Sequence, residues 1–294
     1  MQVGVGTNAT IPATPGPLVL QWARAADDGP FSTLGIIDRI AYPSSESLVT
    51  VAALLGATRR IRATTTVLVA PIRQPALLAK QAATLDALSG GRLTLGLGIG
   101  GREEDYRAAG ASVDFARRAR ALEQQMATMR LVWAGEPPTD GVAPVGPPPV
   151  TAGGPEVLIG GYSPPAARRA GRLGDGFIAG NLPPDRAADL YAQAVVAWQA
   201  AGRRGRPRFV GCGYWALGDQ AAVTRGRDHL RDYYAFAGER AEQIAASMLA
   251  SEAQVHERLD AAAAVGMDEV VLWPAVPELD QLDRLARLVD SRGR

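Results

Sequence analysis

Short runs of apolar and β-branched residues alternate with longer segments of helical periodicity along the chain, and this alternation is the strongest constraint on its fold. The eight runs that we assign as strands cover residues 2–8, 34–40, 62–69, 92–100, 156–162, 176–181, 209–217 and 269–276. The helical segments cover residues 45–58, 75–89, 114–133, 164–173, 184–201, 219–236, 251–265 and 279–289. Eight strand–helix units in 294 residues predict an α/β fold, a (β/α)8 TIM barrel forming a single domain over residues 1–294.

An open, doubly wound sheet is the alternative arrangement of such units. That fold class is often marked by a glycine-rich turn between its first strand and first helix. Here Gly4 and Gly6 lead into Thr7 and Asn8 without a third glycine opening a helix. The closed barrel is therefore favoured.

One segment, residues 135–154, does not fit the alternation. It is rich in proline and glycine, so it forms neither a helix nor a central strand, and it is too long for an ordinary connection. Two alternatives remain open, a lid over the barrel mouth or an exposed insertion. We expect a mobile loop.

The net charge of the chain and the length of its apolar runs limit the kinds of binding partner that we expect. The 31 basic residues against 30 acidic ones leave no excess field for nucleic acid or an anionic membrane. No run approaches eighteen apolar residues, and the first residues lack the pattern of a secretion signal. We expect a cytoplasmic protein that acts on a small molecule.

Few residues could ligate a metal or act as a thiol nucleophile. Cys212 is the single cysteine, and His229 and His256 are the two histidines. We therefore predict no metal site, and a packing role for Cys212.

In a barrel of this kind the chemistry lies where strands end at their carboxyl termini. Thr7 ends the first predicted strand, and Asp38 and Arg39 end the second. Asp38 follows an apolar strand, so its carboxylate either serves the site or pairs with a neighbouring cation such as Arg39. These residues are candidates for the site.

Glycines thin the end of the fourth predicted strand, at Gly96, Gly98, Gly100 and Gly101. Glycine weakens a strand unless another group must approach closely. A flat ring lying against the strand is one explanation, and bending for barrel closure is the other.

The segment that follows the fifth predicted strand combines a glycine pair with a helix start. After Gly160 and Gly161, Ser163 is suited to capping and Pro164 to the first helical turn. Free amides at such a start favour an anion, which predicts a phosphate site.

Several linked motifs resemble the signature of the bacterial luciferase-like monooxygenases. The resemblance extends from the first strand to the last helix. The matching segments are Arg73-Gln74-Pro75, residues 84–92, residues 95–100, Gly160-Gly161-Tyr162-Ser163 and residues 172–177.

This resemblance implies a barrel that binds FMN or the deazaflavin coenzyme F420 with the ring in its mouth. In the F420-using branch an acidic residue after the second strand lies near the ring, and Asp38 matches it. The family also implies a non-prolyl cis peptide at Thr66-Val67, in a bulge that supports the ring. The implied cofactor-binding set is Thr7, Asp38, Thr66, Val67, Gly98, Gly100, Gly160, Gly161, Gly180 and Asn181.

The sequence departs from several F420-dependent dehydrogenases at their proton-transfer positions. Those enzymes carry Asp-His after the second strand and glutamate after the glycines, whereas this chain has Asp38-Arg39 and Gly101-Arg102. We therefore favour reduction of an activated double bond or imine, or a flavin-type oxygenation, over alcohol oxidation. Asp38 and Arg39 are the catalytic candidates, and Arg39 is suited to an acidic substrate or to the cofactor tail.

The sequence thus predicts an F420-dependent oxidoreductase that exchanges hydride between the deazaflavin and a small organic substrate. One alternative is an FMN-dependent monooxygenase served by a separate reductase, and another is a non-catalytic flavin-binding protein. The resemblance also implies a homodimer formed by the helices beside the second and third strands.

Overall fold

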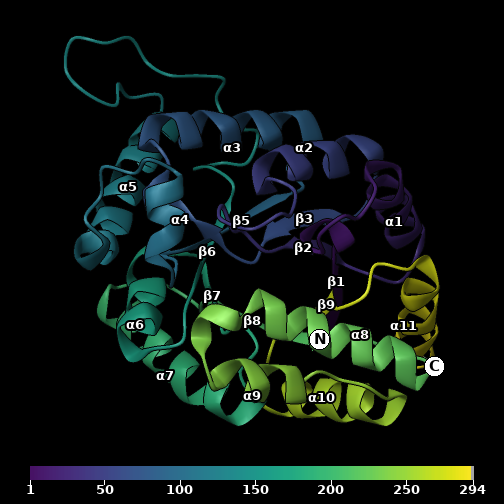
Figure 1. Ribbon diagram of the computed structural model, residues 1–294. Helices are drawn as coiled ribbons and strands as arrows, with labels where there is room; N and C mark the ends of the chain where they lie inside the picture. Colours follow the sequence, from purple (N-terminus) through teal and green to yellow (C-terminus); the bar gives the residue numbers. More distant parts are fainter. Residues whose placement is uncertain (293–294) are drawn as a thin grey trace.

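The computed structural model describes residues 1–292, and its sheet is a closed parallel barrel surrounded by helices (Figure 1). The sheet order runs β3-β2-β1-β9-β8-β7-β6-β5-β4, and a further pairing of β3 with β5 closes the ring. This confirms the predicted (β/α)8 barrel. The strands are β1 (Gln2–Gly6), β2 (Thr33–Ile36), β3 (Arg62–Thr65), β4 (Leu68–Val69), β5 (Leu93–Gly98), β6 (Glu156–Gly160), β7 (Gly176–Ile178), β8 (Arg208–Trp215) and β9 (Glu269–Pro274).

The third predicted strand, residues 62–69, is divided into β3 and β4. The division lies at the peptide bond between Thr66 and Val67, which is cis. Both pieces pair with β5, so the two segments together occupy one position in an eight-stranded barrel.

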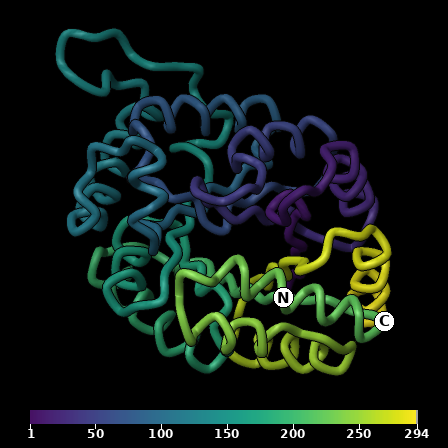
Figure 2. Tube along the Cα trace, in the orientation of Figure 1, coloured from purple at the N-terminus to yellow at the C-terminus, as the bar shows by residue number. Residues whose placement is uncertain are grey.

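The helices form a ring outside the sheet, and α1 and α11 close it beside the β1–β9 pairing (Figure 2). No helix within residues 1–292 is long and apolar enough to cross a membrane. The helices are α1 (Gly16–Asp28), α2 (Ser47–Ala57), α3 (Pro75–Ser89), α4 (Glu103–Ala108), α5 (Arg118–Trp133), α6 (Pro164–Leu173), α7 (Pro184–Ala200), α8 (Gln220–Tyr233), α9 (Arg240–Ala246), α10 (Glu252–Ala264) and α11 (Leu279–Ser291), with short 3-10 turns at η1 (Asn8–Thr10), η2 (Ala70–Ile72), η3 (Phe115–Arg117) and η4 (Ala235–Ala237).

The sequence analysis did not identify α1, α4 and α9. The signal for α1 was present, because its buried residues Val19, Trp22, Ala23 and Ala26 recur at helical spacing. The two others are short helices within the segments after β5 and β8.

Residues 135–154 connect α5 to β6 without helix or strand. Because the segment leads into the amino end of β6, it lies at the end of the barrel opposite the mouth. The second half of the segment is tied to α3. Thr151 donates two hydrogen bonds of 2.8 Å to the buried Asp86, and Lys80 donates one of 2.7 Å to the carbonyl of Gly146. The segment projects away from the helix ring (Figure 2). These contacts and this direction favour an exposed insertion over a lid, and the mobility of the segment stays a prediction.

A charged network closes the floor of the barrel, where the strands begin. Arg208 pairs with Glu156 at 2.5 Å and with Glu269 at 2.6 Å, and Ser32 donates to Glu269. The side chain of Glu269 is only 2% exposed. A buried carboxylate needs such partners, because burying it without compensation is costly.

We expect Glu269→Gln to lower the free energy of unfolding by about 2 kcal/mol, because it removes one charge of a buried pair and leaves Arg208 less well neutralised. Urea denaturation measures the effect. The control is Glu242→Gln, which breaks an exposed pair with Arg231 and should cost less than about 0.5 kcal/mol. Equal effects of the two changes would contradict a stabilising role for the floor.

Candidate active site

The carboxyl ends of the strands meet at the mouth of the barrel, and the bulge between β3 and β4 is its central feature. The bulge carries the cis peptide that the resemblance implied at Thr66-Val67. Thr66 is held on both sides, since its hydroxyl donates to the carbonyl of Ile36 at 3.1 Å and accepts from Nε1 of Trp273 at 2.9 Å. The bulge is therefore tied to β2 and β9 at once.

The side chain of Val67 lies against Gly98 and Gly160. A Cβ atom at Gly98 would be 2.5 Å from Cγ2 of Val67, and one at Gly160 would be 2.6 Å from its Cγ1. Both distances are too short for real carbon atoms. These glycines thus make room for Val67, a protein side chain that neither of our explanations of the thinned strand included.

The two other glycines of the thinned strand accommodate protein atoms as well. A Cβ at Gly96 would collide with the carbonyl of Thr65, and one at Gly100 would be 2.8 Å from Cγ1 of Val69. Gly100 also has a φ of +67°, which favours glycine. Only at Gly101 would a Cβ meet open space.

Asp38 is buried, and both of its carboxylate oxygens accept hydrogen bonds. Oδ1 accepts from Ser47 at 2.7 Å and from Arg73 at 3.1 Å. Oδ2 accepts from the amide of Val69 at 2.8 Å and from Arg73 at 2.7 Å. The carboxylate therefore anchors β4 through protein donors to both of its oxygens.

The partner of Asp38 is Arg73, which the sequence analysis quoted only as part of a motif. Arg73 also pairs with Glu46 at 2.9 Å and donates to the carbonyl of Val69 at 3.0 Å. A carboxylate that ends an apolar strand requires a cation. The sequence analysis considered Arg39 for that role, but the structure gives it to Arg73.

Arg39 lies among aromatic rings. Its guanidinium is 4.3 Å from the ring centroid of Tyr42 and 4.5 Å from that of Tyr233, and it donates to the carbonyl of Tyr233. These contacts tie the end of α8 to the loop after β2. Within residues 1–292, Nε of Arg39 is buried without a hydrogen-bond partner.

Aromatic side chains from β8, β9 and α8 gather beside the bulge. The rings of Tyr214 and Trp273 are 4.9 Å apart, and the hydroxyls of Tyr214 and Tyr234 are 2.7 Å apart. Burial raises the pKa of both phenols above the ordinary value, which keeps them protonated at neutral pH. Sequence reasoning did not assign these tyrosines to the site, because only the tertiary contact between β8 and α8 brings them together.

Cys212 lies on β8, two residues before Tyr214. The side chain is buried in the core, and burial raises the pKa of its thiol. This is the packing role that the sequence predicted. Within the described residues, no three His, Cys, Asp or Glu side chains are grouped closely enough to hold a metal ion.

The turn after β6 differs from the capped helix start that we expected. Ser163 makes no side-chain capping bond, and Pro164 and Pro165 have no amide hydrogen to offer. The amide of Gly161 donates to the carbonyl of Ile178 at 3.2 Å, and a Cβ at Gly161 would collide with Ala166. The helix start therefore offers fewer free amides to an anion than the sequence suggested.

Gly180 and Asn181 lie at the end of β7, beside this turn. Gly180 has a φ of +62°, and a Cβ there would collide with the phenol of Tyr162. Asn181 donates to the hydroxyl of Ser247 at 3.0 Å, and its buried Oδ1 has no partner within residues 1–292. A polar group of a ligand would complete this amide.

Thr7 lies at the end of β1 and is 1% exposed. Its hydroxyl accepts from the amide of Ala9 at 3.3 Å and so caps η1. The site thus brings together Thr66, Val67, Gly98 and Gly160 directly, whereas Thr7 serves the local backbone.

Comparisons with known proteins agree with this architecture. An uncharacterised protein of Mycobacterium tuberculosis is 32% identical over 213 residues, which cover 62% of this chain and 71% of that protein. The F420-dependent glucose-6-phosphate dehydrogenase of Gordonia bronchialis is 32% identical over 167 residues, 51% of this chain and 46% of that enzyme. The solved coenzyme F420-dependent tetrahydromethanopterin reductase of Methanopyrus kandleri superimposes with a TM-score of 0.79 at 15% identity, covering 100% of this chain and 99% of that one.

The luciferase-like monooxygenase family model matches residues 2–275. The match includes the bulge, the glycines that accommodate Val67 and the aromatic group at the mouth. The chain belongs to the luciferase-like monooxygenase family.

Proposed function

We propose that this protein is an F420-dependent oxidoreductase that transfers hydride between the deazaflavin and a small organic substrate. The observation that carries the proposal is the likeness, at 32% identity over half of the chain, to an enzyme that is itself F420-dependent. The acidic residue expected after the second strand in that branch is present as Asp38.

The residues at the mouth suit a flat heterocycle with an anionic chain. Val67 is half-buried on a bulge that is hydrogen-bonded to β2 and β9, so it offers a rigid apolar support. We infer that Gly160, Gly161, Gly180 and Asn181 would hold the phosphate region. The unpartnered Oδ1 of Asn181 and Nε of Arg39 support a polar ligand near them.

The bound deazaflavin would supply two-electron hydride chemistry, and the protein would supply position and protons. Tyr214 and Tyr234 place two phenol hydroxyls 2.7 Å apart at the mouth, so they are our candidates for donating a hydrogen bond to the substrate in place of the histidine and glutamate that this chain lacks. We assign Asp38 to positioning, because its carboxylate already accepts four hydrogen bonds. Arg39 is proposed to hold the end of α8 over the mouth.

We also propose a homodimer that uses α2 and α3. Large apolar side chains are exposed on these helices, with Val49 at 71%, Leu77 at 54% and Leu88 at 83%. Exposed apolar residues grouped on neighbouring helices are typical of protein–protein contacts. A cytoplasmic location stays a prediction.

Titration of the purified protein with F420 and with FMN, oxidised and reduced, tests the cofactor. We expect F420 to bind at least about tenfold more tightly than FMN, which corresponds to about 1.4 kcal/mol. Fluorescence and calorimetry measure both constants. Preference for reduced FMN would support the monooxygenase with a separate reductase, and binding of neither would support a protein without this chemistry.

The contact between Val67 and Gly160 allows a compensating pair of substitutions. Gly160→Ala should lower the free energy of unfolding by about 1 to 3 kcal/mol and weaken F420 binding, because the new methyl group displaces Val67. Adding Val67→Ala should restore most of the stability, because the clash is with a side chain. Gly101→Ala, where a Cβ meets open space, is the control. A double variant no more stable than Gly160→Ala would refute the assigned contact.

The anchoring role of Asp38 is tested with Asp38→Asn. The amide keeps the shape but turns one oxygen into a donor that faces Arg73 or the amide of Val69, so we expect a lower melting temperature and about tenfold weaker F420 binding. Glu46→Gln, which alters an exposed partner of the same Arg73, should change the affinity less than about twofold. Unaltered F420 affinity in Asp38→Asn would show that the anchor does not position the cofactor.

A further inference from the structure

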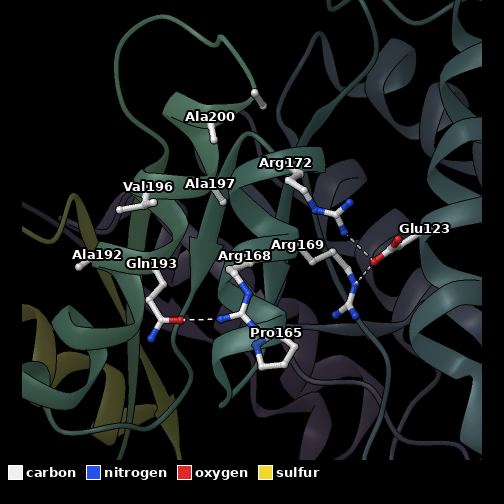
Figure 3. Close-up of a pocket in the computed structure, with 11 residues that line it drawn as sticks. Glu123, Pro165, Arg168, Arg169, Arg172, Ala192, Gln193, Val196, Ala197 and Ala200 are labelled. Atoms are coloured by element: carbon white, nitrogen blue, oxygen red, sulfur yellow. Dashed lines mark hydrogen bonds and ion pairs between the residues drawn. The ribbon is translucent and has the colours of Figure 1, made fainter.

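A groove of about 770 Å³ lies outside the barrel, between α5, α6 and α7 (Figure 3). One wall is formed by the arginine side chains of α6, and the other by small apolar residues of α7. The groove is distinct from the barrel mouth. Helix faces line the groove, whereas strand ends form the mouth. No step of the proposed function uses it.

The groove forms because α6 and α7 touch closely along one line and diverge beside it. At Gly171 a Cβ atom would collide with the carbonyl of Ala194, so the two backbones are in direct contact there. Beside this line α7 presents Val196, Ala197 and Ala200, whose short side chains leave the space unfilled. Val196 is 65% exposed.

Three arginines line this groove, and Glu123 is the one carboxylate among the lining side chains. Glu123 of α5 accepts from Arg169 at 3.1 Å and from Arg172 at 2.9 Å. Arg168 donates to the neutral amide of Gln193 at 2.9 Å. The three arginines and one glutamate that line the groove therefore carry a net charge of +2, and Arg168 has no carboxylate partner among the lining side chains.

Glu123 demonstrates what kind of group this wall binds. Its carboxylate is bridged by two guanidinium groups, as the dashed lines in Figure 3 show. Guanidinium groups match carboxylates and phosphates in geometry as well as in charge. The exposed Arg168 and Arg172 can make the same contacts with an oxyanion from solution.

We propose that this groove binds a small organic anion, with its carboxylate or phosphate against Arg168 and Arg172 and an apolar body against Val196 and Ala197. The volume lies within the range of about 300 to 1,000 Å³ that is usual for small-molecule sites. Net positive charge on one wall and apolar surface on the other select an amphipathic anion over a neutral or purely ionic ligand.

The probe is 8-anilinonaphthalene-1-sulfonate, an amphipathic anion that fluoresces when it binds to apolar surface. We expect the double variant Arg168→Gln/Arg172→Gln to bind it at least tenfold more weakly than the unaltered protein. Arg186→Gln on α7 is the control, because it removes an exposed arginine that does not line the groove. Unchanged binding in the double variant, or an equal loss in the control, would overturn the proposal.

Glu123→Gln provides the opposite test. Removing the internal carboxylate frees Arg169 and Arg172, so affinity for the probe should rise about threefold or more. A thermal melt of the same variant shows whether it is folded. If the variant is unfolded, Val196→Asp replaces it, and the added negative charge on the opposite wall should weaken binding. No rise with Glu123→Gln, or no loss with Val196→Asp, would count against the site.

Displacement of the probe distinguishes the two oxyanions. Benzoate and phenyl phosphate share the apolar ring and differ in the charged group, and inorganic phosphate lacks the ring. We expect one of the two aromatic anions to displace the probe at concentrations at least tenfold below inorganic phosphate. Displacement by none of them, or by all three equally, would overturn the assignment of an amphipathic anion.

Discussion

The side chain of Val67 needs space that only glycine can leave on two neighbouring strands, and the arrangement of the mouth depends on this contact. A Cβ atom on Gly98 of β5 would be 2.5 Å from one of its methyl groups, and a Cβ atom on Gly160 of β6 would be 2.6 Å from the other. Thr66 holds the other side of the same bulge through Ile36 and Trp273. Contacts within the protein thus hold a rigid apolar feature at the centre of the mouth.

The groups around the bulge divide into those that hold it and those that remain available. Asp38 and Arg73 form a buried ion pair whose hydrogen bonds are satisfied by β4 and by each other, and such a pair fixes geometry rather than reacting. The phenols of Tyr214 and Tyr234 are hydrogen-bonded to each other, and because this contact uses the hydrogen of one hydroxyl, the other hydroxyl can still donate a hydrogen bond. The two ends of the barrel therefore have different tasks. Ion pairs close the floor, whereas the mouth combines the Asp38–Arg73 pair with aromatic side chains.

The helix ring carries features that the barrel itself does not require. Closure of the sheet needs α6 and α7 to pack against it, and Gly171 brings their backbones together. It does not require three arginines beside a row of short side chains. The groove differs in this respect from the floor of the barrel, where Arg208 is paired with both Glu156 and Glu269.

Strand–helix alternation, set by apolar periodicity, was enough to predict the barrel, because eight parallel strands of this length have few other ways to bury both faces. The motifs around residues 84–100 and 160–177 were enough to identify the family and to locate the bulge at Thr66 and Val67. The sequence did not reveal why Gly98 and Gly160 are glycines. The side chain that approaches both of them is that of Val67, which lies much earlier in the chain. The sequence suggested Arg39 as a partner of Asp38, whereas packing brings Arg73 within hydrogen-bonding distance and leaves Arg39 among aromatic rings. Local patterns determine the elements and their order, whereas contacts between distant residues determine what each polar group is free to do.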